Sequence, residues 1–342
     1  MVIGMTYDLK TDYVFKSGDP QDANAEFDHP LTVQFIEDSL VGMGHQVVRL
    51  GNIRQLLGSM DQVQVDLVFN IAEGIGGRNR EAQVPMILEL KKIPFVGSDG
   101  LTLSLTLDKR MTKKILLGEG IPTPRFFEIR NRSYRIPAGL SFPLIVKPRF
   151  EGSSKGISEK SVVHSPLELE RQAFWINEMY RQPALVEEFI RGTEFTVAVI
   201  GNDPPEALPV VQIQIDGKSD LGDLFYTFSR IASGAEYLCP AQIDAGLEAR
   251  LRELAIRTYQ TVDCLDFGRV DFRVDRSGNP YVLEINPLPS LSTEDVFAVL
   301  AAHEGIPYEQ MLGRIIRTAA KRLGIKERAV RPEPVEGRTV AR

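Results

Sequence analysis

Two carboxylates oppose each other on a predicted hairpin in the C-terminal third of the chain. Residues 268 to 287 read GRVDFRVDRSGNPYVLEINP, with turn-forming residues between Asp275 and Pro280. If Asp275 pairs with Pro280, Asp271 lies directly opposite Glu284, because side chains alternate along strands. Directly opposed carboxylates repel each other unless a cation lies between them.

The same face carries Arg269 opposite Asn286. Carboxylate and amide oxygens are typical ligands of Mg²⁺ or Mn²⁺, so Asp271, Glu284 and Asn286 are candidate metal ligands. The alternative is a solvated face whose charges point into water. On the other face this register predicts the apolar pairs Val270–Ile285, Phe272–Leu283 and Val274–Tyr281, and a slip by one residue would break both faces.

A second group of residues has features of a phosphate site. The stretch VKPRFEGSSKG places Lys147 at a strand end, before a loop that holds Ser153 and Ser154. Backbone N–H groups and hydroxyls of such a loop bind phosphate oxygens, and a lysine adds charge. Lys109 lies near a predicted helix start, where the helix dipole disfavours a cation unless an anion is near. An ordinary glycine-serine turn and a surface lysine are the alternatives.

The stretch VEEFIRGTEF places Glu187, Glu188 and Glu194 around one turn. A carboxylate accepts hydrogen bonds from ribose hydroxyls, and an extended backbone can pair with the edge of an adenine. Charges on an edge strand are the alternative.

The first hundred residues alternate predicted strands and helices, which indicates a parallel sheet covered by helices on both faces. Ligands gather at the carboxyl ends of such strands. The loop EGIGGRNRE follows the third strand, so it is a candidate substrate loop with Glu73, Arg78 and Arg80. Its glycines do not fit the GxGxxG spacing of a dinucleotide site.

Further elements follow in the rest of the chain. We predict a helix from Leu105, two strands flanking the glycine-serine loop, and a strand pair that turns at 191–193. Further helices are expected at 245–263 and 308–322. The segment 326–342 is rich in proline and charge and is expected to be disordered.

Composition is that of an ordinary soluble globular protein, with 43% hydrophobic and 25% charged residues. The net charge of −6 gives no reason to expect a nucleic-acid partner. The two cysteines, Cys239 and Cys264, form no CxxC pattern. Without a signal-peptide pattern or a membrane-spanning apolar run, we expect a cytoplasmic protein with no membrane partner.

The order of these motifs resembles the ATP-grasp superfamily and, within it, the D-alanine–D-alanine ligases. The resemblance covers residues 93 to 322 most closely. The motifs that carry it are GSDGLTLSLTLDK, PLIVKPRFEGSSKG, LVEEFIRGTEFTVAV, EYLCPA, GRVDF and LEINPLPSLS.

The resemblance implies an α/β fold with an N-terminal parallel-sheet domain and a two-subdomain ATP-grasp fold. The implied ranges are 1–98 for the Rossmann-like substrate domain, 99–190 for the central subdomain and 191–325 for the C-terminal catalytic subdomain. It also implies small amino acid or amine substrates and a homodimer.

The resemblance further implies roles for individual residues. Lys109 and Lys147 would contact ATP phosphates, and the Ser153–Ser154 loop would close over them. The residues expected at the adenine are Glu187, Glu188, Phe189 and Ile190, with Glu194 at the ribose. Asp271, Glu284 and Asn286 would hold two Mg²⁺ ions. Arg269 would stabilise the tetrahedral intermediate, and Ser153 and Arg230 would be further catalytic residues. The implied chemistry is amide formation through an acyl phosphate.

Departures from the family pattern cluster at the substrate. Glu73 stands where these ligases have histidine, and 77–80 reads Gly-Arg-Asn-Arg where they have Gly-Glu-Asp-Gly. Ser290 ends the segment that corresponds to their Asn-Thr-x-Pro-Gly, and Asp295 aligns with a small hydroxyl residue that receives a substrate carboxylate. An aspartate there favours a cationic or hydroxyl group, with Arg78 and Arg80 available to an anionic group. In the alternative, Asp295 only caps the following helix.

Two other functions stay open. One is a ligase of the same mould that joins another amino acid or a metabolite amine. The other is a non-catalytic nucleotide-binding module, which should lack a metal ligand or the arginine at position 269.

Overall fold

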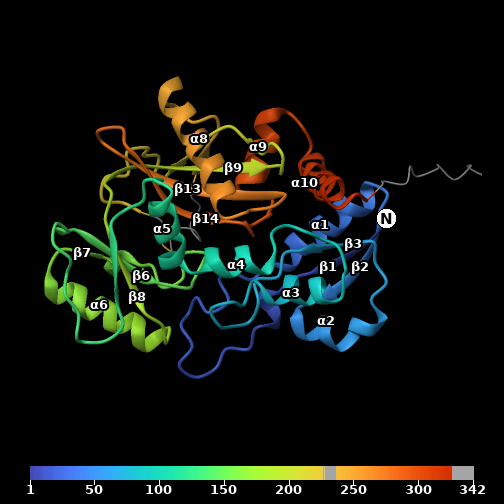
Figure 1. Cartoon of the computed structure of the whole chain (residues 1–342), viewed down its shortest axis with the longest axis horizontal. Coiled ribbons are helices and arrows are strands. Elements are labelled where there is room, and N and C mark those ends of the chain that lie inside the picture. The colour runs from blue at the N-terminus through green and yellow to red at the C-terminus, as the bar shows by residue number, and fades with distance from the viewer. Residues whose placement is uncertain (226, 228–235, 326–342) are drawn as a thin grey trace, which may run out of the picture.

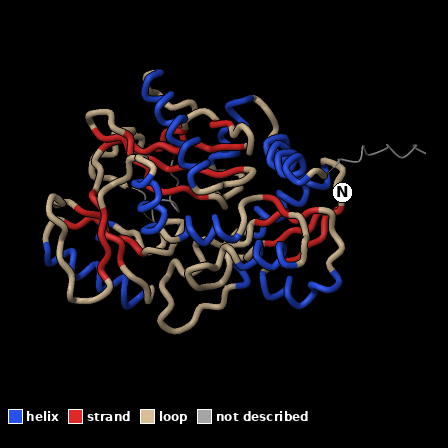
Figure 2. The backbone as a smooth tube through the Cα atoms, viewed as in Figure 1, coloured by secondary structure: helices blue, strands red, loops and turns tan. Residues whose placement is uncertain are grey.

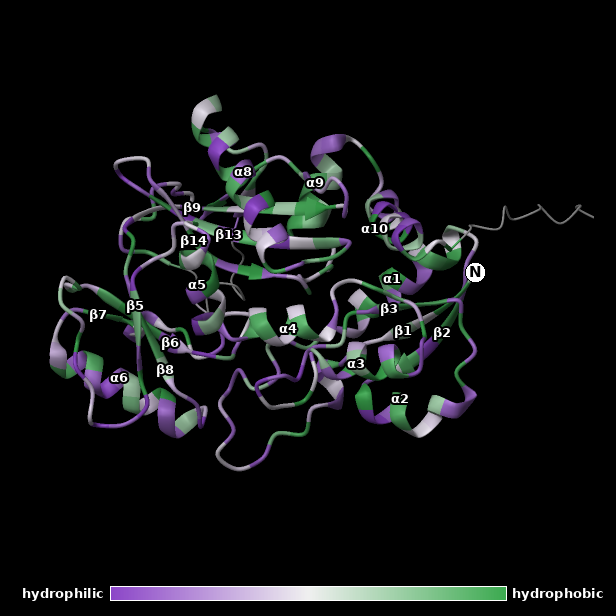
Figure 3. Ribbon diagram, in the orientation of Figure 1, coloured by the Kyte–Doolittle hydropathy of each residue, from purple (hydrophilic) through white to green (hydrophobic). Residues whose placement is uncertain are grey.

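The computed structural model describes residues 1–225, 227 and 236–325 (Figure 1). Three sheets form in turn along the chain, with helices packed on their faces, as the tube in Figure 2 shows. Apolar residues concentrate on the strands and on the inner sides of the helices (Figure 3). The predicted α/β fold is confirmed. No helix within the described ranges is long and apolar enough to cross a membrane.

The N-terminal sheet is parallel, with strand order β2-β1-β3-β4. Its strands are β1 (Val2–Thr6), β2 (Gln46–Gly51), β3 (Leu67–Asn70) and β4 (Phe95–Val96). Its helices are α1 (Pro30–Gly42), α2 (Ile53–Ser59) and α3 (Gln83–Leu90). Ile36 of α1 and Met5 of β1 belong to one core, and Leu56 of α2 and Leu88 of α3 to a second. The two faces of the sheet are thus covered separately, as alternation of strands and helices predicted.

The central sheet is antiparallel, with strand order β5-β8-β6-β7. Its strands are β5 (Phe126–Ile129), β6 (Leu144–Pro148), β7 (Val162–Val163) and β8 (Ala184–Glu188). Helix α6 (Pro166–Met179) packs on it through Leu169 and Ile176. The strand predicted directly after the glycine-serine loop is absent there; the chain first makes a 3-10 helix, Glu159–Ser161, and then the short strand β7.

The C-terminal sheet has the path β12-β11-β9-β13-β14, with β10 paired to β9. Its strands are β9 (Gly192–Ile200), β10 (Glu206–Ala207), β11 (Val211–Gln214), β12 (Glu236–Leu238), β13 (Phe267–Asp275) and β14 (Pro280–Asn286). Helix α8 (Ala245–Thr261) covers one face. Helices α9 (Val296–Glu304) and α10 (Tyr308–Leu323) cover the other and join its core to that of the N-terminal sheet.

Two predicted elements are wrong in detail. The strand pair expected at 184–200 does not form a hairpin, because β8 belongs to the central sheet and β9 to the C-terminal sheet. The single helix predicted from Leu105 is interrupted, because α4 (Gly100–Leu107) ends and α5 (Lys109–Gly118) begins within that stretch. Asp108 separates them, because its side chain accepts a hydrogen bond from the Met111 N–H and caps α5. Lys109 is therefore the first residue of α5.

The β13–β14 hairpin confirms the predicted register in the half away from the turn, where Asp271 pairs with Glu284 and Arg269 with Asn286. In the half next to the turn, however, Phe272 pairs with Val282 and Val274 with Pro280, because Leu283 forms a β-bulge. The predicted pairs Phe272–Leu283 and Val274–Tyr281 are wrong. Val282, and not Leu283, enters the apolar core.

Candidate nucleotide and metal site

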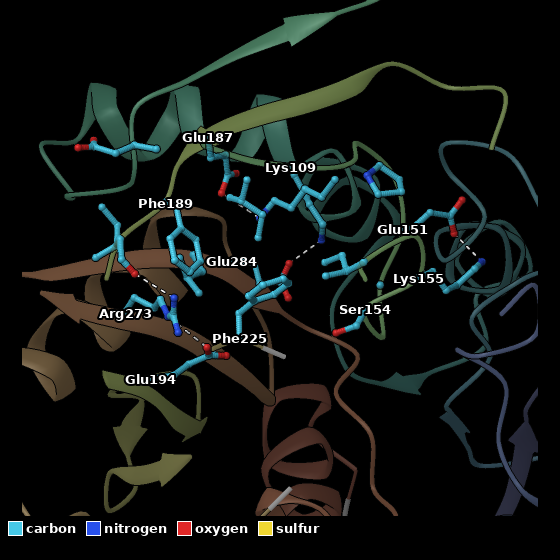
Figure 4. Close-up of a pocket in the computed structure, with 18 residues that line it drawn as sticks. Lys109, Glu151, Ser154, Lys155, Glu187, Phe189, Glu194, Phe225, Arg273 and Glu284 are labelled. Carbon is cyan, nitrogen blue, oxygen red and sulfur yellow. Dashed lines mark hydrogen bonds and ion pairs between the residues drawn. The ribbon is translucent and has the colours of Figure 1, made fainter. Parts of the chain in front are cut away.

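A cavity lies between the central and C-terminal sheets (Figure 4). It brings together nine of the residues predicted to bind ATP or metal: Lys109, Lys147, Ser154, Glu187, Glu188, Phe189, Ile190, Glu194 and Glu284. Leu283 of the bulge and Phe225, whose ring centroid is 5.8 Å from that of Phe189, also line it. A lining that combines apolar and aromatic side chains with charged ones is the composition expected of a nucleotide pocket.

A buried carboxylate at this cavity, Glu187, pairs with two lysines, of which Lys147 lines the cavity. Glu187 has a side chain only 1% exposed, and it lies 3.0 Å from Lys147 Nζ and 3.1 Å from Lys113 Nζ. Burial raises the pKa of Glu187, but the two lysine charges outweigh burial and hold that pKa below its ordinary value. Burial lowers the pKa of Lys113 to about 8. Glu187 therefore fixes the positions of the Lys113 and Lys147 side chains through two buried ion pairs.

Lys113 was not among the residues predicted from the sequence. It lies four residues after Lys109 on α5, so both side chains point to the same side of the helix. The four-residue spacing between Lys109 and Lys113 is the feature of the sequence that could have predicted Lys113 as a site residue.

The predicted metal ligands lie together on the hairpin. Glu284 accepts a 2.5 Å hydrogen bond from Lys109 Nζ, and although burial opposes it, this lysine together with Lys147 lowers the pKa of Glu284 to about 2. Asp271 accepts hydrogen bonds from Asn286 Nδ2 at 2.8 Å and Thr196 Oγ1 at 2.7 Å. An ionised carboxylate, a second carboxylate and an amide on adjacent positions are a ligand set that fits a divalent cation.

Glu194, the predicted ribose ligand, lies 3.3 Å from Arg273 Nε. Burial raises the pKa of Glu194, and the Arg273 charge opposes that shift. Arg273 also donates a 2.9 Å hydrogen bond to the carbonyl of Ile190 and lies 5.0 Å from the centroid of the Phe189 ring. Arg273 was also missed from the sequence, although it follows Asp271 by two positions and so shares its face of β13.

The predicted substrate loop places its two arginines differently. Arg80 is 5% exposed, with Nη2 2.5 Å from a Glu26 carboxylate oxygen and Nη1 2.7 Å from the Phe150 carbonyl. Arg78 has a side chain 65% exposed, which reaches Asp108 at 3.2 Å and lies over the Phe150 ring. Arg80 is thus already paired, whereas Arg78 is accessible to a ligand.

Glu73 belongs to a cluster of acidic groups. Carboxylate oxygens of Glu26, Glu73 and Glu81 all lie within 4.8 Å of one another. Glu81 is 8% exposed and makes no hydrogen bond or ion pair within the described part of the chain. Burial, together with the neighbouring carboxylates, raises the pKa of Glu73 well above its ordinary value, and burial raises that of Glu81 to about 7.

Replacing Glu81 with glutamine is expected to stabilise the protein above pH 7. In the folded state the Glu81 carboxyl has a pKa of about 7, whereas its ordinary pKa, which it regains on unfolding, is 4.5. The unfolded chain therefore loses this proton first, and the stability of the native protein falls as the pH rises from about 4.5 to 7. Glutamine removes this dependence, and the gain should be on the order of 1–3 kcal/mol at pH 8 and near zero at pH 4. Thermal unfolding of both proteins across pH 4–8 measures it. A constant difference at all pH values would contradict the shift.

Asp295 begins helix α9 and caps it, since its carboxylate accepts a 2.7 Å hydrogen bond from the Val296 N–H. The cap, which was the alternative interpretation, is therefore observed. The same carboxylate also lies 3.5 Å from Arg269 Nη1, and Arg269 Nε is 3.0 Å from Asp271. Asp295 is thus connected through Arg269 to the candidate metal ligands.

The remaining predicted residues lie at the edges of the site. Ser290 is exposed and accepts a long, 3.4 Å hydrogen bond from the Ser292 N–H. Ser153 is exposed and is not part of the cavity lining. Arg230 lies outside the described residues.

Comparisons with known proteins agree with this arrangement. The family model "D-ala D-ala ligase C-terminus" matches residues 118–317. The D-alanine–D-alanine ligase of Pelotomaculum thermopropionicum is 32% identical over 275 residues, which cover 78% of this chain and 83% of the relative. The uncharacterized protein y4sG of Sinorhizobium fredii is 38% identical over 257 residues, 75% of either chain.

Among solved structures, a D-alanine–D-alanine ligase from Bacillus anthracis complexed with ATP matches with a TM-score of 0.73. The match covers 94% of this chain and 98% of that one, at 24% identity, so it supports the fold. Both the sequence relatives and the family model confirm the resemblance inferred from the motifs. The chain belongs to the D-alanine–D-alanine ligase family of ATP-grasp carbon–nitrogen ligases.

Proposed function

We propose that the protein joins a carboxylate to an amine in an ATP-dependent reaction that passes through an acyl phosphate. The observation that carries this proposal is the cavity lined by Lys109, Lys147 and Glu284, with Glu284 opposite Asp271 on the β13–β14 hairpin. Lysines and a carboxylate in a pocket that also has aromatic side chains fit a nucleotide whose phosphates are bound together with metal. A non-catalytic module is disfavoured, because the metal ligands and Arg269 are all present.

The residues of the cavity suit the parts of ATP in order. Phe189, Ile190 and Leu283 would flank the adenine, with Glu187 and Glu188 on the same strand end. Glu194 would accept from the ribose hydroxyls. Lys147, Lys109 and the Ser153–Ser154 loop would hold the phosphates.

The ligand set Asp271, Glu284 and Asn286 would hold Mg²⁺, or Mn²⁺, and two ions are proposed. When bound, such ions offset the negative charge of the phosphoryl group in transfer. Arg269 carries a fixed positive charge next to these ligands and would stabilise the negative charge that develops when an amine attacks the acyl phosphate. Arg230 and Ser153 remain predicted catalytic residues.

The substrates are proposed to differ from two molecules of D-alanine in at least one position. Glu73 and Glu81 form an acidic cluster where the family pattern has a histidine, and Asp295 stands at the position of the small hydroxyl residue. A carboxylate near the second substrate favours a cationic or hydroxyl group, because unpaired like charges in a closed site are unfavourable. A different amino acid or a metabolite amine is therefore the second candidate, and Arg78 is accessible to an anionic group on it.

D-Alanine alone is expected to support little ATP hydrolysis, and the Asp295→Ser variant is expected to raise it. Serine is also a good N-cap, so this change removes the charge beside Arg269 while α9 keeps its cap. Phosphate release measured with D-alanine and with a panel of other amino acids and amines tests both statements.

Two outcomes would decide against parts of this proposal. Robust D-alanyl-D-alanine formation by the unmodified protein, at a rate that Asp295→Ser leaves alone, would show that Asp295 is only a cap. Absence of phosphate release across the panel, together with absence of ATP binding, would remove the ligase assignment. A homodimer and a cytoplasmic location are further proposals that rest on the family resemblance.

A further inference from the structure

The segment between β1 and α1 reaches across to the glycine-serine loop that follows β6. In Figure 1 it is the dark blue loop below the centre of the molecule, between the N-terminal and central sheets. Two of its carboxylates accept hydrogen bonds from that loop. Glu26 Oε1 accepts from the Gly152 N–H at 2.6 Å, and Asp22 Oδ2 accepts from the Gly156 N–H at 2.7 Å.

The loop residues between these two glycines have an unfavourable backbone. Ser153 and Ser154 have φ values of 46° and 55°, in the left-handed region that side chains other than glycine rarely occupy. Such a conformation persists only where the surroundings fix it. Here both flanking amides are fixed by carboxylates, whereas the N–H groups of Ser153 and Ser154 make no hydrogen bond within the described part of the chain.

The two carboxylates are themselves held in place. Asp22 is 7% exposed and accepts hydrogen bonds of 2.8 and 2.9 Å from the Tyr180 hydroxyl. Glu26 is paired with Arg80 and also lies 3.1 Å from Lys155 Nζ. Neither carboxylate is free to move to another partner, so they are fixed supports for the loop.

Space at the two glycines is matched to this arrangement. A Cβ atom on Gly152 would come within 2.9 Å of Glu26 Oε1, and Gly156 has a φ of +72° with Pro148 Cγ 2.4 Å from a would-be Cβ. A side chain at either glycine would therefore collide, at Gly152 with Glu26 itself and at Gly156 with Pro148.

We propose that Asp22 and Glu26 are positioning residues of the nucleotide site. Their carboxylates accept hydrogen bonds from the Gly152 and Gly156 N–H groups and so hold the turn between them in place. The N–H groups of Ser153 and Ser154 are then left to bind phosphate oxygens, since successive N–H groups in a turn form an anion site. Ser154 and Lys155 line the cavity, as Figure 4 shows, so Ser154 borders it and Ser153 is the preceding residue of the same turn. The inference rests on the proposed function, because it assumes that the cavity binds ATP.

Three variants test it. Asp22→Ala removes both the Gly156 and the Tyr180 bond, and Asp22→Asn keeps an acceptor oxygen, so it should recover part of the effect. Asp19→Asn is the matched control, because Asp19 lies on the same segment but contacts Tyr13 and not the loop. Thermal unfolding checks that each variant folds, and Asp22→Asn carries the test if Asp22→Ala does not.

Two measurements are made on each variant. Hydrogen exchange of the Gly156 amide without nucleotide should accelerate at least tenfold in Asp22→Ala and stay unchanged in Asp19→Asn. Calorimetry with ATP and Mg²⁺ should give a Kd raised about tenfold in Asp22→Ala, less in Asp22→Asn, and unaltered in the control. In steady state, the KM for ATP should rise with little change in kcat.

The outcomes separate the two proposals. If the unmodified protein does not bind ATP, the proposed function fails and not merely the positioning role. If the unmodified protein binds ATP and Asp22→Ala binds it equally well, the positioning role is overturned, even where exchange at Gly156 is faster. Unchanged exchange at Gly156 would overturn the support itself.

Discussion

Replacing Glu284 with alanine is expected to reduce metal-dependent ATP turnover by about 10²- to 10³-fold, comparable to the loss of a charge-stabilising group in other enzymes. The carboxylate is ionised, with a pKa of about 2, and it faces Asp271 across the hairpin. Its loss removes one proposed metal ligand. Phosphate release with saturating ATP and Mg²⁺ measures the effect.

A control is needed because Glu284 also pairs with Lys109, which is 9% exposed. Alanine leaves that lysine as an unpaired buried cation, which lowers stability. Glu284→Gln keeps an acceptor for Lys109 but loses the charge, so it should fold normally and still be inactive. Glu253→Ala changes an exposed glutamate on α8 and should behave as the unmodified protein. Normal turnover in Glu284→Gln would exclude the carboxylate as a metal ligand.

Lys147→Ala is expected to weaken ATP binding more than Lys109→Ala does. Lys147 is the second-last residue of β6, just before the glycine-serine loop, which would place it close to the proposed phosphates. Its loss leaves Glu187 still neutralised by Lys113, so the fold should tolerate the change. Each lost charge-assisted contact should weaken binding by about 1.5–3 kcal/mol, roughly ten- to a hundredfold.

Calorimetric titration with ATP measures this ranking. Lys114→Ala is the matched control, since Lys114 is exposed on the same helix as Lys109. Equal affinities in the unmodified protein and in both lysine variants would refute the phosphate site. An equal loss in the control would show that only net charge matters.

The site could be predicted from the sequence where it depends on local patterns. Asp271 and Glu284 are opposed as predicted, although the prediction paired Asp275 with Pro280. Val274 pairs with Pro280 instead, and the bulge at Leu283 restores the predicted pairs from Asp271 onward. Lys109 and Lys147 could be predicted because one begins a helix and the other lies next to the last residue of a strand, before the glycine-serine loop. Their roles come from the family resemblance.

The parts that could not be predicted depend on contacts between distant segments. Glu26 and Gly152 are 126 residues apart, and no periodicity relates them. Glu187 was predicted to face the adenine, but its two buried lysine partners come from α5 and β6, which only the folded structure brings together. The bulge at Leu283 could not be predicted, because no residue type in this part of the strand signals that one residue is left unpaired.

That bulge changes what a single strand can present to the cavity. In a regular strand Leu283 and Glu284 would point to opposite sides, one to each side of the sheet. Because the bulge shifts the phase of β14 by one residue, the hydrocarbon side chain of Leu283 and the carboxylate of Glu284 both line the same cavity. Consecutive residues would therefore contact the base and the metal ions of a bound nucleotide. Deletion of Leu283 would remove the bulge and the contact with the base, while the turn at 275–280 would stay intact.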